Sequence, residues 1–240
     1  MSTYLYIRDS ANRHNLEILG NQRDYLNLQI EQIEGLAANL GQVDEISRSL
    51  VAMDGASGTS VYDQLATKAR MGYLLSNYRN LKGLVSIDLF SLNGAQYHVG
   101  DSLTIADQRS DLRDLLMERT FKAKESVVWH GVEDNVYKYS STLKVLSASK
   151  LVMHPDSSWL KAEPVGVLFI NYSTDYLHGH FSTVDLGQGA YMLVLDDQQR
   201  LIYHPDKNKI GTQVVREFSN LLQGSSGSFI QRLGDTDVLL

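Results

Sequence analysis

The first quarter of the chain carries a helical pattern of apolar positions. From about Ser10 to Met53, apolar side chains recur at steps of three and four residues: Leu19, Leu26, Ile30, Ile33, Ala37 and Leu40. This spacing predicts one apolar stripe along a long helix, which we place at residues 1–53. Because the stripe is narrow and close to heptad spacing, it allows the helix to pack on its own domain or to pair with a second helix.

The composition of residues 54–60 is that of a loop, after which a second helix is expected to run to about Asn80. Ser57 or Thr59 is placed to cap it. From Gly83 on, alternating and β-branched residues predict strands: "LVSIDLF", a strand with Tyr97 and Val99, "SVVWHG", one or two in "NVYKYSSTLKVLSASKLVM", and "PVGVLFINYS".

One tight turn and two helices are also predicted within this β-rich region. Asn93-Gly94 is a strong signal for a tight hairpin, because both residues tolerate a positive φ. Residues 107–121 have the apolar spacing of a helix. A short helix is expected after "PVGVLFINYS", with Ser173 or Thr174 as its cap.

A second, smaller group of strands begins near Gly189. "AYMLVLD" and "RLIYH" predict a hairpin around a polar turn, 216–222 one or two helical turns, and "GSFIQRL" a last strand without a partner. His-Pro-Asp occurs at 154–156 and 204–206, each time after an apolar run. Because proline cannot donate to a β-ladder, both tripeptides are interpreted as strand exits.

The order of these elements predicts an α+β fold, in which a long N-terminal helix precedes two antiparallel sheets. We divide the chain into the helix at 1–53, a first sheet module at 54–182 and a smaller, truncated module at 183–240. No run of strand-helix-strand crossovers indicates a doubly wound nucleotide-binding fold.

Composition restricts the possible functions. The 240 residues are 43% hydrophobic and 21% charged, which is the composition of a folded protein. The net charge is −6 and Lys and Arg form no run, so a nucleic-acid partner is not expected. The absence of cysteine excludes disulfides and thiol catalysis. No apolar run approaches the ~20 residues of a membrane span.

Motifs for catalysis are absent from the sequence: it contains no Gly-rich phosphate loop and no G-x-S-x-G elbow. His178 and His180 form an H-x-H pair next to Asp175, which leaves a metal-dependent hydrolase as one alternative. The sequence offers no third and fourth ligand nearby, so we expect neither a metal nor a cofactor. A scaffold that acts through its long helix is a second alternative.

The C-terminal stretch "AYMLVLDDQQRLIYHPDKNKIG" resembles the membrane-proximal half of a double Cache sensor, which consists of two PAS-like modules. "GLVSIDLFSLNGAQYHVGDSL" and "PVGVLFINYSTDYL" are similar to the first and last strands of the distal module in that family. With the long N-terminal helix, the resemblance spans nearly the whole chain. It implies a membrane-distal PAS-like module at 54–182 and a membrane-proximal one at 183–240.

Double Cache domains sense small molecules outside the bacterial inner membrane and are anchored by flanking membrane helices. The resemblance therefore implies a periplasmic sensor domain without enzymatic activity and with a small-molecule ligand. The narrow apolar stripe of the N-terminal helix allows a homodimer through that helix. For the output it favours a GGDEF diguanylate cyclase, with a histidine kinase or chemoreceptor as the alternatives. The ligand would act by shifting the population between two conformations.

The resemblance also implies ligand-binding residues: Arg119, Phe121, Tyr137, Tyr139 and Asn171 match positions that bind amino acids in the family. Arg119 has the chemistry of a carboxylate clamp. Asn171, however, takes the place of an aspartate and supplies no charge for an amine. We therefore expect a carboxylate or a polar metabolite, or a ring held between Trp129 and Tyr137. Tyr137 and Tyr139 are expected to point the same way from one strand.

Overall fold

The computed structural model of the chain describes residues 2–52, 60–78, 80–101, 107–123, 126–154, 163–187, 190–214, 230–233 and 236–239. The first helices and strands are α1 (Ser2–Gly41), α2 (Asp44–Ala52), α3 (Val61–Ser76), β1 (Leu84–Ser91), β2 (Gln96–Gly100), α4 (Ser110–Lys122) and β3 (Val128–Asp134). They are followed by β4 (Lys144–Met153), β5 (Pro164–Ser173), α5 (Thr174–Phe181), β6 (Val194–Leu195), β7 (Leu201–Tyr203), the 3-10 turn η1 (Lys207–Lys209), β8 (Ile230–Leu233) and β9 (Thr236–Leu239). Within the described residues, no helix has the length and apolar character to cross a membrane.

Five strands form an antiparallel sheet in the order β2-β1-β5-β4-β3. β1 and β2 join through the predicted Asn93-Gly94 turn, where Gly94 has φ +89°. β1 and β5 are far apart in the sequence but pair in the middle of the sheet. The antiparallel pairing and the mixture of helices and strands confirm the predicted α+β class.

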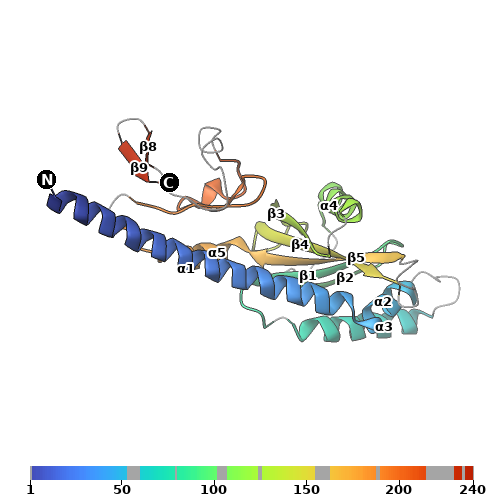
Figure 1. Ribbon diagram of the computed structural model, residues 1–240. Coiled ribbons are helices and arrows are strands. Elements are labelled where there is room, and N and C mark those ends of the chain that lie inside the picture. Colours follow the sequence, from blue (N-terminus) through green and yellow to red (C-terminus); the bar gives the residue numbers. More distant parts are fainter. Residues whose placement is uncertain are drawn as a thin grey trace.

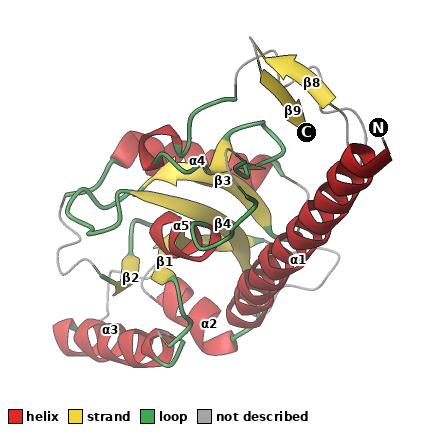
Figure 2. Ribbon diagram, turned by 90° about the vertical axis from the view of Figure 1, so that its left-hand side faces the viewer, coloured by secondary structure: helices red, strands yellow, loops and turns green. Residues whose placement is uncertain are grey.

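Helices cover both faces of this sheet (Figure 2). α1, α2 and α3 lie on one face, where α1 contacts β4 and β5, and α3 contacts β2. α4 lies on the opposite face and contacts β4. We call the two surfaces of the sheet the α1 face and the α4 face.

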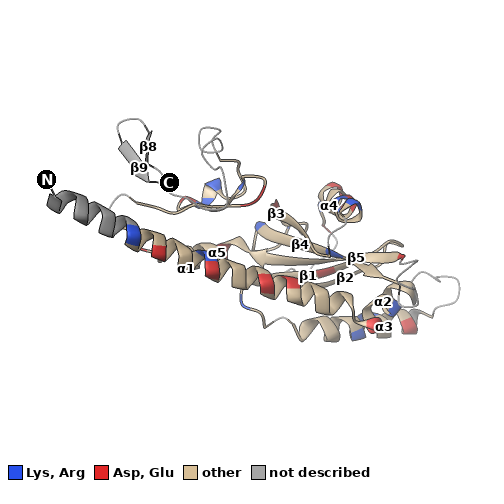
Figure 3. Ribbon diagram, in the orientation of Figure 1, with Lys and Arg blue, Asp and Glu red and all other residues tan. Residues whose placement is uncertain are grey.

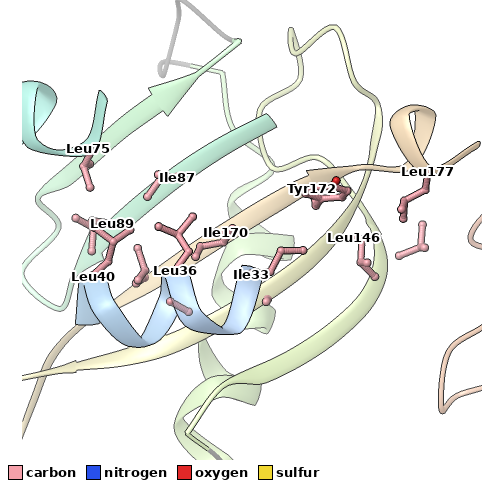
Figure 4. Packing of buried hydrophobic residues seen from close by; sticks show 14 of the residues in the cluster. Ile33, Leu36, Leu40, Leu75, Ile87, Leu89, Leu146, Ile170, Tyr172 and Leu177 are labelled. Carbon is pink, nitrogen blue, oxygen red and sulfur yellow. The ribbon is translucent and has the colours of Figure 1, made fainter. Parts of the chain in front are cut away.

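The α1 face holds the main apolar core. Ile33, Leu36 and Leu40 of α1 point at the sheet and pack against buried strand residues such as Ile87 and Ile170 (Figure 4). The C-terminal half of the predicted helical stripe therefore packs on the chain's own sheet. Its N-terminal part is more open, and Leu19 is exposed.

The predicted helix at 1–53 was wrong in one respect, because it is broken after Gly41. Glycine is a poor helix former, and the backbone nitrogens of Gln42 and Val43 make turn hydrogen bonds of 3.2 Å to Asn39 and Leu40. Asp44 and Glu45 then start α2, where acidic side chains in the first turn favour a new helix.

Helix caps decide where two other helices begin. Ser60 caps α3, since its Oγ accepts a hydrogen bond from Asp63 N at 3.1 Å. The expected caps Ser57 and Thr59 lie outside the described residues. Ser173 caps α5 as predicted, with its Oγ accepting from Tyr176 N at 3.0 Å.

The C-terminal segment contains two separate hairpins. β6 pairs with β7 as predicted, and His204-Pro205-Asp206 follows β7, where Asp206 accepts from Asn208 N at 3.0 Å to begin η1. This confirms a strand exit. β8 pairs with β9, so the expectation of a last strand without a partner was wrong. The helical turns predicted at 216–222 lie outside the described residues.

The molecule is elongated (Figure 1). The beginning of α1 and the β8–β9 hairpin lie at one end, whereas α2 and α3 lie at the other. Acidic and basic residues are interspersed along α1 and α4 (Figure 3). The division of the chain at residues 53 and 182 stays a prediction.

Candidate functional site

The α4 face carries a line of small and polar residues across all five strands. Gly100 pairs with Ser86, Ser86 with Asn171, Asn171 with Ser147, and Ser147 with Gly131. Directly paired residues of antiparallel strands share one face of a sheet. Phe169, two positions before Asn171, packs with Leu116 of α4, which identifies the face. We call these five paired residues the polar row.

A buried carboxylate lies beside the polar row. Asp88 Oδ2 accepts hydrogen bonds from Ser86 Oγ at 2.7 Å and from Asn171 Nδ2 at 2.9 Å. Its Oδ1 lies 2.5 Å from Nδ1 of His98. Asp88 itself is 1% exposed. A buried carboxylate is costly unless it is paired and hydrogen-bonded, and here four side chains form one network that we call the Asp88 cluster: Ser86, Asp88, His98 and Asn171.

Two buried hydroxyl groups on the α4 face lack hydrogen-bond partners among the described residues, those of Tyr137 and Ser147. The ring of Tyr137 packs on His98, with 4.2 Å between ring centroids. Burial, and then the negative charge of Asp88 and its side-chain interaction with the hydroxyl, raise the pKa of Tyr137. The hydroxyl therefore lies near Asp88 and stays protonated. Because an unpaired buried polar group costs free energy, these hydroxyls are suited to binding a further polar molecule.

A second buried polar cluster joins α4 to the sheet. Thr120 Oγ1 lies 2.6 Å from Ser149 Oγ, which lies 2.8 Å from Nε2 of His130. Burial is the largest cause that lowers the pKa of His130 to about 4, and the positive charges of Arg119 and Arg200 add to it. His130 is therefore neutral at neutral pH, and its Nε2 and both hydroxyl groups of this cluster have partners.

The predicted site residues separate into two groups. Tyr137 and Asn171 lie together at the Asp88 cluster. Arg119 instead donates from Nη1 to Glu133 Oε1 at 3.0 Å, and its side chain is 43% exposed. Phe121 is also exposed, because it lies in the last turn of α4 on the side away from the sheet-facing Leu116 and Thr120.

Two predictions about aromatic residues were wrong. Trp129 donates from Nε1 to Glu34 Oε1 of α1 at 2.8 Å, so it lies on the α1 face and cannot hold a ring against Tyr137. Tyr137 and Tyr139 lie in the turn between β3 and β4, not in a strand. Tyr137 is buried while Tyr139 is 70% exposed, because the chain reverses there around Asn135, which accepts from Tyr137 N at 2.9 Å.

Sequence reasoning missed the most buried charged residue of the site. Asp88 interrupts the apolar strand "LVSIDLF", and Ser86 precedes it by two positions. Side chains two apart share a face, so a polar pair inside a strand that is buried on both sides was the available signal. Arg109 was missed as well. Its backbone nitrogen donates to Val136 O at 2.8 Å and its guanidinium donates to Asn135 O, next to Tyr137.

A cavity of about 210 Å³ lies at the other end of the α4 face, lined by Phe90, Ser91, Leu92, Gly94, Ala95, Gln96, Arg113, Asp114 and Met117. It is smaller than the usual range of ligand pockets. Its cation, Arg113, already pairs with Asp114 at 2.8 Å. The polar row is the better candidate site, because it holds buried polar groups that lack partners.

The histidine pair considered for a metal makes other contacts. His178 Nε2 lies 3.2 Å from Pro205 O, and His180 Nε2 lies 2.9 Å from Gln22 Oε1. Asp175 accepts from Lys207 Nζ at 2.7 Å. These side chains connect α5 to α1 and to the turn after β7. Among the described residues, no group of three His, Cys, Asp or Glu side chains is placed to hold a metal ion.

No protein-family model matches the sequence, and no curated protein matches it. Solved structures do match. The ligand-binding domain of the Campylobacter jejuni chemoreceptor Tlp3, in complex with 4-methylisoleucine, superposes with a TM-score of 0.65 at 14% identity. That match covers 96% of this chain and 85% of the other.

Two further structures are similar, both ligand-binding domains of Pseudomonas aeruginosa PAO1 amino acid chemoreceptors. PctB in complex with L-Arg has a TM-score of 0.57 and 16% identity, over 96% of this chain and 79% of that chain. PctC in complex with GABA has a TM-score of 0.54 and 12% identity, over 92% and 86%. Identities this low show a shared fold, the one in which these receptor domains bind their ligands.

Proposed function

We propose that this chain is the small-molecule-binding domain of a bacterial transmembrane signalling receptor, and that it works outside the cytoplasm. One observation carries the proposal. The α4 face of the sheet holds the polar row, the Asp88 cluster and two buried hydroxyl groups without partners. A domain that only needed stability would fill this face with apolar side chains, as the α1 face does.

The proposed ligand lies against the polar row, between Asn171, Ser147 and Tyr137. The serines of the row add only short side chains. Gly131 at one end is covered by Arg200 and Asp196, and Gly100 at the other end by Ser86 and His98, so the ligand is proposed to lie over the middle of the row. The hydroxyls of Tyr137 and Ser147 can each donate or accept a hydrogen bond. A bound molecule would satisfy both and so bind more tightly than its apolar contacts alone would allow.

Charge favours a ligand with an ammonium group. Asn171 supplies no negative charge, but Asp88 does so one strand away and is hydrogen-bonded to Asn171 at 2.9 Å. The negative charge that the family resemblance places on β5 is therefore supplied here by Asp88 on β1. Two cations lie near Tyr137 and could bind a carboxylate: Arg109, which donates to Asn135 O, and Arg113, whose positive charge acts on the Tyr137 hydroxyl. Together these groups suit an amino acid, the class of molecule bound in the similar Tlp3 and PctB structures.

A thermal-shift measurement tests the ligand class. The probes are L-valine, L-arginine and γ-aminobutyrate, together with two relatives of valine: 3-methylbutanoate, which lacks the amine, and 2-methylpropan-1-amine, which lacks the carboxylate. A ligand at 100 times its Kd stabilises the folded state by about 2.7 kcal/mol. We expect at least one amino acid to raise Tm by several degrees and its amine-free relative to have no effect.

Asp88→Asn is the decisive variant, because it keeps the shape of the side chain and removes its charge. It should abolish the shift. Asp114→Asn on the exposed side of α4 is the matched control and should keep it. No shift with any probe would contradict the ligand class. A shift that survives in Asp88→Asn would move the site to the cavity beside Arg113.

The identity of the output is a finer proposal. The resemblance in the sequence favours a diguanylate cyclase, while the similar solved structures belong to chemoreceptors. No GGDEF motif occurs in the 240 residues. Fusions of the full-length protein to a reporter that is active only outside the cytoplasm test the location, and activity of a cytoplasmic reporter at the same position would contradict it.

We also propose that α1 supports a homodimer. Leu16 and Leu19 are exposed on this helix, whereas Ile33 and Leu40 are buried on the sheet. The free part of the stripe therefore remains open to a second copy. Sedimentation equilibrium of the wild type and of a Leu16→Glu/Leu19→Glu variant tests this. A wild type that stays monomeric at high concentration would contradict the dimer.

A further inference from the structure

Arg200, in the hairpin of β6 and β7, reaches across to the main sheet. Its Nε donates to Asp196 Oδ2 at 2.9 Å, within the same hairpin. Its Nη1 donates to Val132 O at 3.2 Å and to Glu133 Oε1 at 3.0 Å, and its Nη2 donates to His130 O, all three on β3. The guanidinium therefore joins the C-terminal hairpin to the edge strand of the sheet.

The two carboxylates around Arg200 are fixed from both sides. Asp196 Oδ1 accepts from the backbone nitrogens of Gln198 at 2.9 Å and Arg200 at 2.8 Å, which closes the hairpin turn. Glu133 and Arg200 side chains are each 14% exposed, and Asp196 is 6% exposed. One guanidinium thus donates to two shielded carboxylates, and this arrangement is stiffer than a surface ion pair.

The strand is shaped to receive this guanidinium. Gly131 lies at a register shift between β3 and β4 and has φ +73°. A Cβ at this position would collide with both the Arg200 guanidinium and the Asp196 carboxylate. Only glycine combines that backbone conformation with that space. Gly131 is also the end of the polar row and pairs with Ser147, one of the two residues with an unpartnered hydroxyl.

α4 is tied to the same strand. Arg119 in its last turn donates to Glu133 Oε1 at 3.0 Å, the oxygen that also accepts from Arg200. The side chain of His130 lies 2.8 Å from Ser149 Oγ, which contacts Thr120 of α4, while its carbonyl accepts from Arg200. Two connected paths thus run from α4 through β3 to the hairpin.

We propose that Arg119, Glu133, Arg200 and Asp196 form a coupling latch, which transmits movements of α4 and the edge of the sheet to the C-terminal hairpin. The inference rests on the proposed function for its purpose, because ligand binding at the polar row would move α4 and β3. The latch itself is a mechanical link that works with or without ligand. Its glycine and shared carboxylate place the hairpin in fixed register with the sensing face.

A second ion pair connects the C-terminal segment to the rest of the fold, but it is neither shielded nor linked to α4. Lys207 pairs with Asp175 of α5 at 2.7 Å, but both side chains are more than half exposed. Exposed pairs contribute little and are screened by salt. Since α5 directly follows β5 in the chain, this ion pair joins the C-terminal segment to the end of β5 and does not involve α4. It provides a control for the experiment.

Hydrogen exchange measured by mass spectrometry on the full chain tests the latch without a ligand. Arg119→Ala on α4 should speed amide exchange at Leu201–Tyr203 about threefold, which corresponds to about 0.7 kcal/mol of local stability. Arg113→Ala, a second α4 arginine that pairs with Asp114, is the matched control and should leave that peptide unchanged. Lys207→Ala should also leave the exchange of α4 unchanged.

If the latch transmits the effect, Arg119→Ala should no longer change exchange at the hairpin once the Glu133 carboxylate has been removed. In the Glu133→Gln background, which keeps an acceptor oxygen and is expected to fold, Arg119→Ala should add no further exchange at Leu201–Tyr203. Near-ultraviolet circular dichroism confirms that the variants are folded. Equal effects of Arg119→Ala in the wild-type and Glu133→Gln backgrounds would overturn the latch, as would no effect in either.

A ligand arm separates the latch from the proposed function. Any of L-valine, L-arginine or γ-aminobutyrate that raises Tm should slow exchange at Leu201–Tyr203 in the wild type but not in Glu133→Gln. If no probe raises Tm while Arg119→Ala still acts on the hairpin through Glu133, the latch stands and the ligand class fails. If a probe raises Tm and slows exchange at the hairpin equally in both proteins, the ligand class stands and the latch fails.

Discussion

The two faces of the five-stranded sheet use the same strands for opposite purposes. On the α1 face, Ile87 and Ile170 belong to one apolar cluster with Leu36 and Leu40. On the α4 face, alternate residues of the same strands include Asp88 and Asn171. The comparison separates the face that stabilises the fold from the face proposed to bind a ligand: the first excludes water with apolar contacts, and the second keeps hydrogen-bonding groups in a buried position.

The two faces of the sheet differ in the size of their apolar clusters. The apolar cluster on the α4 face contains only Phe90, Leu116, Val136, Val167 and Phe169 as buried residues, beside a much larger cluster on the α1 face. Free energy of folding scales with buried apolar area. The α1 face therefore provides most of the stability, and this allows the α4 face to carry strained or unsatisfied polar groups.

The largest expected change in the free energy of unfolding comes from a substitution on the α1 face. Ile87 is fully buried in a central strand. Ile87→Ala should lower the free energy of unfolding by about 2–5 kcal/mol, from lost burial and a residual cavity. Urea denaturation followed by circular dichroism measures it, with Leu28→Ala on the exposed side of α1 as a control within about 0.5 kcal/mol of the wild type. A similar loss in both variants would contradict the assigned core.

The next effect is the pH dependence caused by His130. Its pKa in the folded state is about 4, below the ordinary value of 6.5. The unfolded chain therefore binds one more proton between pH 6.5 and 4, so stability falls as the pH is lowered through this window and levels off below it. At about 1.36 kcal/mol for each pH unit, the contribution reaches about 3 kcal/mol.

Carboxylates also titrate near the lower end of this window, so the measurement is a difference. Unfolding free energies of the wild type and of His130→Gln are compared from pH 7 to pH 4. The slope of the variant should be smaller by about one proton. Parallel curves would show that His130 has an ordinary pKa and is not buried beside Arg119 and Arg200.

Two serines of β4 sharpen the comparison within the α4 face. Ser149 contacts Thr120 and His130, whereas Ser147, two residues earlier on the same face, has no hydrogen-bond partner among the described residues. Ser149→Ala should cost about 1–2 kcal/mol, since it leaves buried partners unsatisfied. Ser147→Ala should leave stability unchanged or raise it by about 1 kcal/mol.

The effects of these two substitutions on ligand binding should be opposite to their effects on stability. Ser147→Ala is expected to weaken the response to whichever amino acid raises Tm, although the protein itself is no less stable. Ser149→Ala should keep that response. Thermal unfolding with and without the probe measures both properties in one experiment. A Ser147→Ala variant that is destabilised and still responds fully would remove the polar row from the binding site.

The smallest effect concerns Arg119. Its ion pair with Glu133 is partly exposed, so Arg119→Ala should lower the free energy of unfolding by less than about 1 kcal/mol. The thermal shift caused by a bound amino acid should persist, because the guanidinium is engaged by Glu133. Titration calorimetry checks this against Arg109→Ala, which should weaken binding. Loss of binding in Arg119→Ala alone would restore the carboxylate clamp expected from the sequence.

Part of the candidate site was accessible from the sequence. Asn171 and Tyr137 follow from positions that the resemblance marks, and the structure brings both to Asp88. Trp129 and Tyr139 do not lie with them, because a bulge after Trp129 and a chain reversal at Asn135 change which way side chains point. Such local breaks in alternation depend on hydrogen bonds that sequence periodicity does not contain.

The sequence by itself determined the order of helices and hairpins, because the period of apolar positions and turn residues such as Asn93-Gly94 act locally. It also determined that α1 offers one apolar stripe. Only the tertiary structure decided that β1 and β5 are neighbours, and therefore that Ser86 and Asp88 meet Asn171. The pairing of distant strands depends on the packing of the whole sheet between α1 and α4, and a site assembled across it exists only once that packing is complete.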